Sequence, residues 1–184
     1  MGQDVVTQTL QRISAKLDEL GIPYAVAGGM ALGAHGYVRA TVDVDILVTQ
    51  EGLERVHKAL EGLGYVPPFA GSKNLRDVTS SVRVEFLVAG QYPGDGKPKP
   101  VAFPDPAAAA VEIDGVKYLQ LERLIELKLA SGMTGGVNRM KDLVDVVELI
   151  KLLSLPADVA DRLDPYVREK FRELWNGLRQ AGPE

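Results

Sequence analysis

The sequence predicts an α/β (α+β) fold, with an α/β core over residues 1–120 followed by a helical region over residues 121–184. In the core, segments with the 3.6-residue spacing of a buried helix face alternate with short apolar runs typical of strands. Beyond residue 120, every periodic segment has helical spacing. Because no repeat or low-complexity segment separates the two parts, we expect the helical region to pack on the core.

The amino-acid composition limits the kinds of protein that this chain can be. The chain has 184 residues, of which 46% are hydrophobic and 25% charged, as in ordinary soluble globular domains. Its formal net charge of −4 does not favour nucleic acid as a partner. The absence of cysteine excludes disulfides and thiolate metal sites. Without an apolar run of about 18 residues or a signal peptide, we expect a cytoplasmic protein that does not cross a membrane.

The core begins with apolar residues at helical spacing over 4–20, a helix that Gly21 and Pro23 end. The further elements expected in the core are a strand at 24–27, a Gly28-Gly29 turn, a short helix over 30–35, a strand over 42–49, a helix over 52–62 whose buried face ends with Leu63, a strand over 82–88, and a hairpin of 111–113 and 116–119. We expect residues 66–77 to be a loop. We expect Gly90–Pro106 to be a flap or a mobile loop, with Lys97 and Lys99 as exposed charges.

The helical region contains three helices in this prediction. They cover residues 121–131, 138–153 and 164–179, and Pro165 occupies the first turn of the last one. Pro is tolerated there because the first helical N–H groups have no partner within the helix.

Two aspartates interrupt the apolar strand over 42–49. Side chains alternate between the faces of a strand, so Asp43 and Asp45 share one face about 7 Å apart, while Val42, Val44 and Ile46 point to the core. In the strand over 82–88, Arg83, Glu85 and Leu87 share a face by the same alternation. If the two strands are neighbours, three carboxylates converge on one surface.

Carboxylates that lie close together repel one another, and a bound cation would offset this repulsion. Hard oxygen donors without nearby His or Cys suit Mg²⁺ or Mn²⁺. The sequence therefore predicts a metal site at Asp43, Asp45 and Glu85, where two ions would assist phosphoryl transfer. The alternatives are a solvated acidic strand face and a simple pairing of Glu85 with Arg83.

The Gly28-Gly29 pair supports a phosphate site. A glycine turn that leads into a helix exposes backbone N–H groups and lets a phosphate approach closely. Arg39, which precedes the acidic strand, would add positive charge. The alternative is that the two glycines only form a turn.

These segments, AVAGGMALGAHGYVRATVDVDILV and VRVEF, resemble the nucleotidyltransferase superfamily of the DNA polymerase β type. The resemblance implies a mixed sheet flanked by helices, and transfer of a nucleoside monophosphate from an NTP such as ATP to an acceptor hydroxyl. It implies two Mg²⁺ (or Mn²⁺) ions held by Asp43 and Asp45. It also implies that Glu85 is the third carboxylate, which helps to activate the acceptor, and that Gly28 and Gly29 bind phosphate.

The segment LIELKLASGMTGGVNRMKDLVDVVELI is similar to AbiEii-like and related minimal bacterial nucleotidyltransferases. The resemblance matches Lys128 and Arg139, both of which could hold phosphates. Asp142 and Asp145 share a helix face because they are three residues apart. They are either functional or structural, and in the second case they form ion pairs with Lys128 or Arg139 that join two helices.

The sequence thus favours a Mg²⁺-dependent nucleotidyltransferase. The acceptor stays open between a small molecule, as in antibiotic-modifying relatives, and an RNA or protein hydroxyl, as in toxin-like relatives with an antitoxin-like partner. The alternative is a non-catalytic protein that binds a nucleotide or a partner, related to toxin–antitoxin systems.

Overall fold

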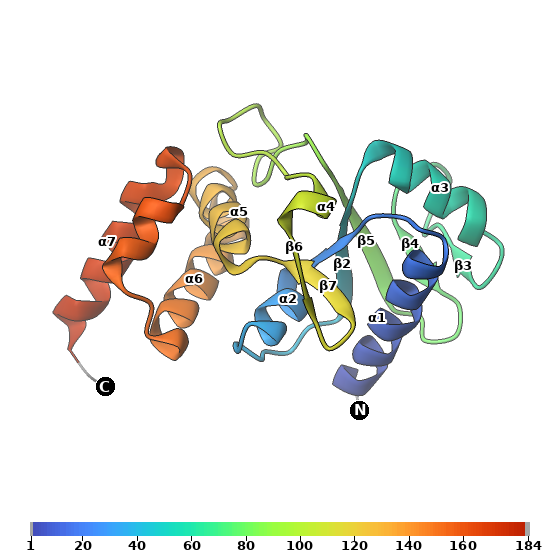
Figure 1. Ribbon diagram of the computed structural model, residues 1–184, viewed down its shortest axis with the longest axis horizontal. Helices are drawn as coiled ribbons and strands as arrows, with labels where there is room; N and C mark the ends of the chain where they lie inside the picture. Colours follow the sequence, from blue (N-terminus) through green and yellow to red (C-terminus); the bar gives the residue numbers. More distant parts are fainter. Residues whose placement is uncertain (1, 183–184) are drawn as a thin grey trace. The chain divides into compact units, whose positions relative to one another are not determined.

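The computed structural model of this protein describes residues 2–182. They form two compact units. The first comprises the chain up to Ala34, Val38–Gly90 and Pro104–Gln120, and the second comprises His35–Tyr37, Gln91–Phe103 and the chain from Leu121 onward. Figure 1 labels most of the helices and strands of both units.

A seven-stranded mixed sheet forms the first unit, which confirms the predicted fold class. The strands are β1 (Ala25–Ala27), β2 (Asp43–Val48), β3 (Tyr65–Val66), β4 (Leu75–Asp77), β5 (Arg83–Val88), β6 (Ala110–Ile113) and β7 (Val116–Leu119). Their order across the sheet is β3-β4-β5-β2-β1-β7-β6. The pairs β2–β5 and β1–β7 are parallel, and the other neighbours are antiparallel.

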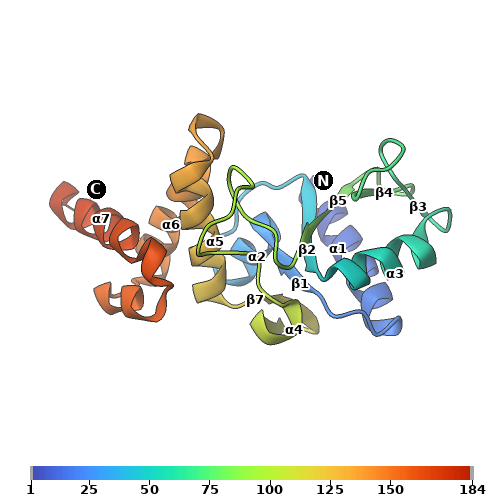
Figure 2. The ribbon, with the colours of Figure 1, turned by 90° about the horizontal axis from the view of Figure 1, so that it is seen from above.

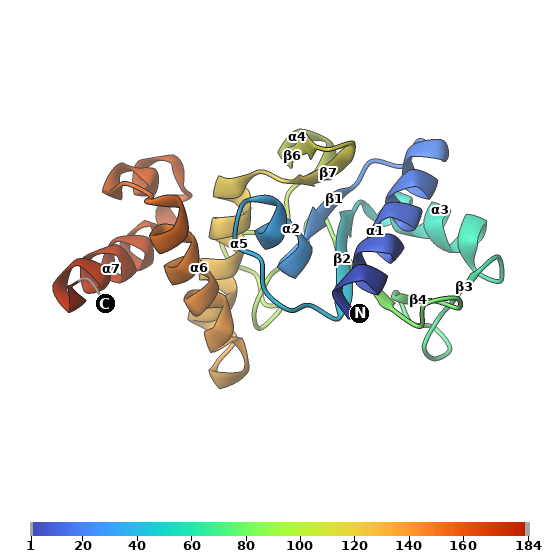
Figure 3. The same cartoon turned by 90° about the horizontal axis from the view of Figure 1, so that it is seen from below.

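Helices cover both faces of this sheet. Within residues 2–182, the helices of the first unit are α1 (Gly2–Glu19), α2 (Gly28–Ala34), α3 (Gln50–Leu60) and the short α4 (Pro106–Ala109). Figure 3 shows α1 and α3 on one side of β2 and α2 on the other. The main core lies on the side of α1 and α3, where their apolar side chains pack against those of β2 and β5: Leu10, Ile13, Leu17, Val44, Ile46, Val56, Val84 and Phe86.

The segment 66–77, expected to be a loop, contributes two short strands to one edge of the sheet. Leu75 of β4 pairs with Val84 of β5 and is fully buried. The prediction missed β3 and β4 because strands of two and three residues carry no detectable alternation of their own. Pairing holds them in place: β4 pairs with β5, and β3 pairs with β4.

Two residues expected to be buried are exposed. Leu63 is 75% exposed because α3 ends at Leu60 and the chain turns through Gly62, where φ is +81°. Val42 is also 75% exposed, because β2 begins only at Asp43. Helical spacing alone does not show where a helix ends, and Leu63 keeps the spacing beyond the last helical turn.

The loop before α4 is closed around a lysine, so the prediction of an exposed Lys99 is wrong. The side chain of Lys99 is 5% exposed. Its ammonium donates to the carbonyl oxygens of Pro93 and Lys97, each at 2.7 Å, and to Oδ1 of Asp95 at 2.8 Å. The ammonium also lies 5.6 Å from the ring centroid of Tyr92. One cation therefore satisfies three acceptors that would otherwise need water.

In the second unit, the chain from Leu121 onward is helical, as predicted. Its long helices are α5 (Leu121–Thr134), α6 (Met140–Leu153) and α7 (Pro165–Ala181), with short 3₁₀ segments at Val137–Arg139 and Ala157–Arg162. Figure 2 shows the three long helices side by side. Their apolar faces meet in a buried core that includes Leu124, Ile125, Leu129, Val146, Leu149, Val167 and Phe171. Over the described part of the chain, no helix is long and apolar enough to cross a membrane.

Candidate functional site

Strand β2 presents Asp43 and Asp45 on one face, as its alternation predicts. Both aspartates are partly exposed, whereas Val44 and Ile46 between and after them are fully buried on the core side. A strand fixes both aspartates through its ladder of backbone hydrogen bonds with β1 and β5. Their spacing is therefore set by the sheet and not by a loop.

The third carboxylate joins them because β5 lies next to β2. The two strands run parallel, and their register pairs Asp43 with Arg83 and Asp45 with Glu85. Residues paired across adjacent strands share a face, with strands about 4.8 Å apart. The structure thus brings Asp43, Asp45 and Glu85 onto one face of the sheet, opposite the core under α1.

Arg83 occupies the same face. Its Nη1 donates to Oε1 of Glu85 at 3.0 Å, in a pair that is partly open to solvent. The hydrogen bond and charge of Glu85, followed by the charge of Asp43, raise the pKa of Arg83. Within residues 2–182, no three Asp, Glu, His or Cys side chains are arranged to hold a metal ion. The metal site stays a prediction, and Arg83 would compete with an ion for Oε1 of Glu85.

Gly28 and Gly29 are the first two residues of α2, two residues earlier than the helix was expected to begin. Gly28 has φ +61° and packs on the carboxyl group of Asp45, with no room for a side chain. A Cβ at Gly29 would lie 2.7 Å from Oγ1 of Thr41 and 2.9 Å from its Cβ. Both glycines therefore allow α2 to start against the segment that enters β2.

Arg39 lies beside the same turn. Its Nη1 is 3.7 Å from the place where a Cβ of Gly29 would stand, and it donates to the carbonyl oxygen of Ala40 at 3.4 Å. Within the first unit, Gly28 therefore lies against Asp45, and Gly29 lies between Thr41 and Arg39. The alternation of residues in the sequence did not predict that the side chain of Thr41 packs against Gly29.

Lys128 and Arg139 belong to the second unit. The side chain of Lys128 is 10% exposed, and its Nζ donates to Oδ1 of Asp142 at 2.9 Å and to Oδ2 of Asp145 at 2.8 Å. Ser131, one turn further along α5, donates to Oδ2 of Asp142 at 2.7 Å. The structural alternative for the two aspartates is therefore present: they join α6 to α5 through Lys128.

This buried network determines the ionisation of Asp142. Burial raises the pKa of Asp142, but the charge and hydrogen bond of Lys128 and the hydrogen bond of Ser131 outweigh it, so that this pKa lies below its usual value. The charge of Arg139 acts in the same direction. Arg139 itself is exposed at the end of the 3₁₀ segment before α6.

The pairing of Glu85 with Arg83, one of the alternatives that the sequence left open, is present in the structure. Sequence reasoning did not assign a role to Ser131. Both contacts have a signal in the sequence. Arg83 stands two residues before Glu85 on the same strand face, and Ser131 stands three residues after Lys128 on the same helix face. In each case the short spacing predicts a contact, but it does not show that the contact is buried or paired.

Comparisons with known proteins identify the family and the fold of this chain. The sequence model of the family described as uncharacterised nucleotidyltransferase matches residues 1–174. No curated protein matches the chain. In fold, the chain is similar to the antibiotic-resistance factor ANT(2'')-Ia in its solution structure, with a TM-score of 0.58, 19% identity and coverage of 98% of this chain and 96% of that chain.

Two further structures are similar. The crystal structure of ANT(2'')-Ia in complex with adenylyl-2''-tobramycin gives a TM-score of 0.58 at 19% identity, over 94% of this chain and 99% of that chain. An antigenic nucleotidyltransferase-like protein from Paracoccidioides brasiliensis gives 0.52 at 20% identity, over 83% of this chain and 78% of that chain. At these identities the likeness shows the fold, while the family match extends over nearly the whole sequence. The chain belongs to this family of uncharacterised nucleotidyltransferases.

Proposed function

We propose that the protein is a Mg²⁺-dependent enzyme that transfers a nucleoside monophosphate from an NTP to an acceptor hydroxyl. One observation carries the proposal: the parallel register of β2 and β5 sets Asp45 beside Glu85, with Asp43 on the same face. Asp45 also contacts Gly28, at the start of α2. Acidic groups for a metal and a glycine turn for phosphate thus share one corner of the first unit.

The donor set fits the ion. Asp43 and Asp45 offer carboxylate oxygens, the ligands that Mg²⁺ prefers, and they leave positions for substrate phosphates and water. When bound, Mg²⁺ would neutralise charge on the phosphates of the NTP. Mn²⁺ would be accepted by the same oxygens.

The chain's own groups would position the reactants. The backbone N–H groups at Gly28 and Gly29, with the guanidinium of Arg39, would hold phosphate oxygens. Glu85 would accept the proton of the acceptor hydroxyl as its oxygen attacks the α-phosphorus. The bond from that phosphorus to the bridging oxygen would break, and pyrophosphate would leave with the electron pair. Positioning and charge stabilisation supply most of the catalysis in such transfers.

The two basic residues of the second unit take different roles in this proposal. Arg139 is exposed and remains a candidate phosphate ligand. The ammonium of Lys128 is buried and bonded to two carboxylates, which supports a role in joining α5 and α6. A phosphate role for Lys128 would require it to leave both partners, at the cost of two uncompensated buried carboxylates.

For the acceptor, we propose a small molecule before an RNA or a protein. The net charge of −4 disfavours RNA. The structurally similar ANT(2'')-Ia has been crystallised with adenylyl-2''-tobramycin, a nucleotidylated small molecule. The toxin-type role that the AbiEii-like resemblance implies, with an antitoxin-like partner, is the second candidate to be tested.

The experiment is a thermal-shift measurement with each of the four NTPs, with and without Mg²⁺. A ligand that binds only the folded state raises the melting temperature. The measurement compares the wild type with the double variant Asp43→Asn/Asp45→Asn. The control is the double variant Asp4→Asn/Glu51→Gln, which removes two exposed charges of the first unit. A Mg²⁺-dependent rise that only the Asp43/Asp45 variant loses supports the proposal.

Two results contradict it. If no NTP raises the melting temperature of the folded wild type, the protein is not a nucleotidyltransferase of this kind. If the rise persists in the Asp43/Asp45 variant, the protein binds nucleotide without this metal site, as in the non-catalytic alternative. With the preferred NTP known, pyrophosphate release with tobramycin, with a neutral polyol and with an RNA oligonucleotide tests the acceptor class.

A further inference from the structure

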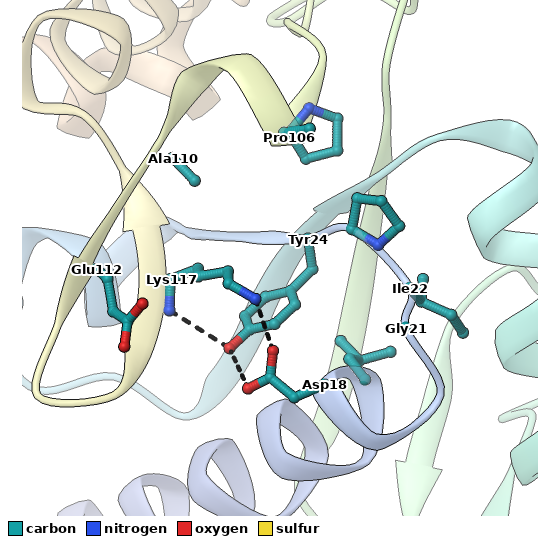
Figure 4. Close-up of a pocket in the computed structure, with 11 residues that line it drawn as sticks. Asp18, Gly21, Ile22, Tyr24, Pro106, Ala110, Glu112 and Lys117 are labelled. Atoms are coloured by element: carbon teal, nitrogen blue, oxygen red, sulfur yellow. Dashed lines mark hydrogen bonds and ion pairs between the residues drawn. The ribbon is translucent and has the colours of Figure 1, made fainter.

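A pocket of about 440 Å³ opens in the first unit, at the end of β1 that lies away from Gly28. Figure 4 shows it between the last turn of α1 with the loop that follows, and the α4–β6 segment with β7. It is lined by Leu17, Asp18, Gly21, Ile22, Pro23, Tyr24, Pro106, Ala107, Ala110, Glu112 and Lys117. Its volume falls within the range of about 300–1,000 Å³ that is typical of small-molecule sites.

The pocket is separate from the candidate active site. Tyr24 precedes β1 and lines the pocket, whereas Gly28 follows β1 and contacts Asp45. The four residue steps between them span about 13 Å of extended chain. A ligand here would therefore not touch the acidic face.

Much of the lining is apolar and rigid. Leu17 and Ile22 are buried in the core and cannot move freely. Pro23 and Pro106 have fixed φ angles and no N–H group to satisfy. The small side chains of Ala107 and Ala110 leave space, so the walls present a preformed surface to an apolar body.

On the polar side of the pocket, the side chain of Lys117 lies across the ring of Tyr24 (Figure 4). Its ammonium lies 5.3 Å from the ring centroid and donates to Oδ1 of Asp18 at 2.7 Å. Its backbone N–H donates to Oη of Tyr24 at 3.3 Å. The hydrogen bond to Asp18 raises the pKa of Lys117, and the charges of Asp18 and Glu112 act in the same direction, so its ammonium stays charged.

A carboxylate remains available at the rim. Glu112 pairs with Lys117 in the β6–β7 register, and in the described part of the chain no cation lies within ion-pair distance of its carboxylate. Asp18, Glu112 and Lys117 together give the lining one net negative charge. The C-terminal end of α1, which carries the negative end of the helix dipole, borders the same pocket.

We infer that this pocket is a second binding site, which takes a small organic amine with an apolar body. The ammonium group is held at the Glu112 side of the rim, and the apolar body lies against Ile22, Pro23 and Pro106. An anion meets repulsion from Glu112 and finds the ammonium of Lys117 already bonded to Asp18. Such a ligand binds independently of the nucleotide.

The experiment compares three indole probes of nearly the same shape: tryptamine, the neutral tryptophol and the anionic indole-3-acetate. Each is titrated into ¹⁵N-labelled full-length protein, and amide chemical shifts report where it binds. Gly21, Glu112 and Lys117 report on the pocket, and Gly28 and Gly29 report on the candidate active site. The variants are Glu112→Gln, the matched control Glu51→Gln at an exposed position of α3, and Ala107→Trp, which places a large side chain in the pocket.

The expected result is that tryptamine shifts the amides of Gly21, Glu112 and Lys117, and that indole-3-acetate binds about tenfold more weakly because attraction becomes repulsion. Glu112→Gln weakens tryptamine about fivefold, Glu51→Gln leaves its affinity unchanged, and Ala107→Trp removes binding of all three probes. The inference is overturned if the three probes bind equally, if millimolar tryptamine causes no shifts, or if its shifts are confined to Gly28 and Gly29.

Discussion

The carboxyl group of Asp45 occupies the space that a side chain at Gly28 would need. A Cβ built on Gly28 would lie 2.8 Å from Cγ of Asp45 and closer still to Oδ2. Gly28 also has a φ of +61°, a backbone conformation that residues other than glycine rarely adopt. The glycine proposed to bind phosphate and the aspartate proposed to bind metal therefore determine each other's position.

We expect Gly28→Ala to move Asp45 and to abolish the Mg²⁺-dependent thermal shift caused by NTP. The backbone strain alone should lower the free energy of unfolding by about 1–3 kcal/mol. Gly21→Ala is the matched control, since Gly21 has φ +64° and open space around its Cβ position. Equal losses of stability and unchanged NTP binding in both variants would show that the contact with Asp45 has no role.

Arg83 should compete with a metal ion for Glu85. Removing it in Arg83→Gln frees Oε1 of Glu85 and takes a cation from the acidic face, so we expect Mn²⁺ to bind about 3–10 times more tightly. The measurement is Mn²⁺ titration followed by electron paramagnetic resonance. Arg76→Gln is the control, because Arg76 pairs with Arg83 across β4 and β5 but does not bond Glu85. Equal effects of the two variants would count against a metal ligand at Glu85.

Lys128 should stabilise the second unit strongly. Lys128→Met leaves Asp142 and Asp145 buried without their cation, and we expect a loss of about 3–5 kcal/mol in the free energy of unfolding, measured in urea. Lys151→Met on α6 removes an exposed pair with Glu148 and should cost at most about 1 kcal/mol. If Lys128→Met unfolds no more easily than the control, the buried network contributes little, and the phosphate role of Lys128 regains support.

Asp142 should make the protein sensitive to acid. Its folded pKa is lowered, so its contribution to stability is complete above the unfolded aspartate pKa of about 3.9 and is lost as the pH falls through the folded value. We expect the free energy of unfolding of the wild type to fall more steeply below about pH 4 than that of Asp142→Asn. Asp158→Asn, at an exposed position, should keep the wild-type slope. Parallel curves for all three proteins would remove Asp142 from the acid response.

Lys99 should keep the loop Gln91–Phe103 closed. Lys99→Met leaves the carbonyl groups of Pro93 and Lys97 and the carboxylate of Asp95 without their common donor, at about 1–3 kcal/mol for each buried group that water does not reach. Limited proteolysis should then cut within the loop at least several times faster. Lys97→Met is the control, because the Lys97 side chain is exposed while its backbone bonds remain. Equal cleavage rates in the two variants would contradict a closing role for Lys99.

The sequence by itself determined the fold class and the faces of the acidic strands. Asp43 and Asp45 share a face because they are two residues apart in a strand, and this holds for any neighbour of that strand. The helices of the second unit could be predicted for the same reason, since their apolar residues recur with the period of the helix. These properties depend only on residues close together in the chain.

The tertiary structure decided which strands are neighbours and which charges are paired. Glu85 is 40 residues from Asp45, and the apolar pattern of β5 is compatible with several neighbours and registers. Packing under α1 and α3 selects the parallel pairing with β2, and that pairing brings Arg83 to the acidic face. Lys128 is likewise buried only because α5 and α6 pack together, which turns a candidate phosphate ligand into the centre of an ion-pair network.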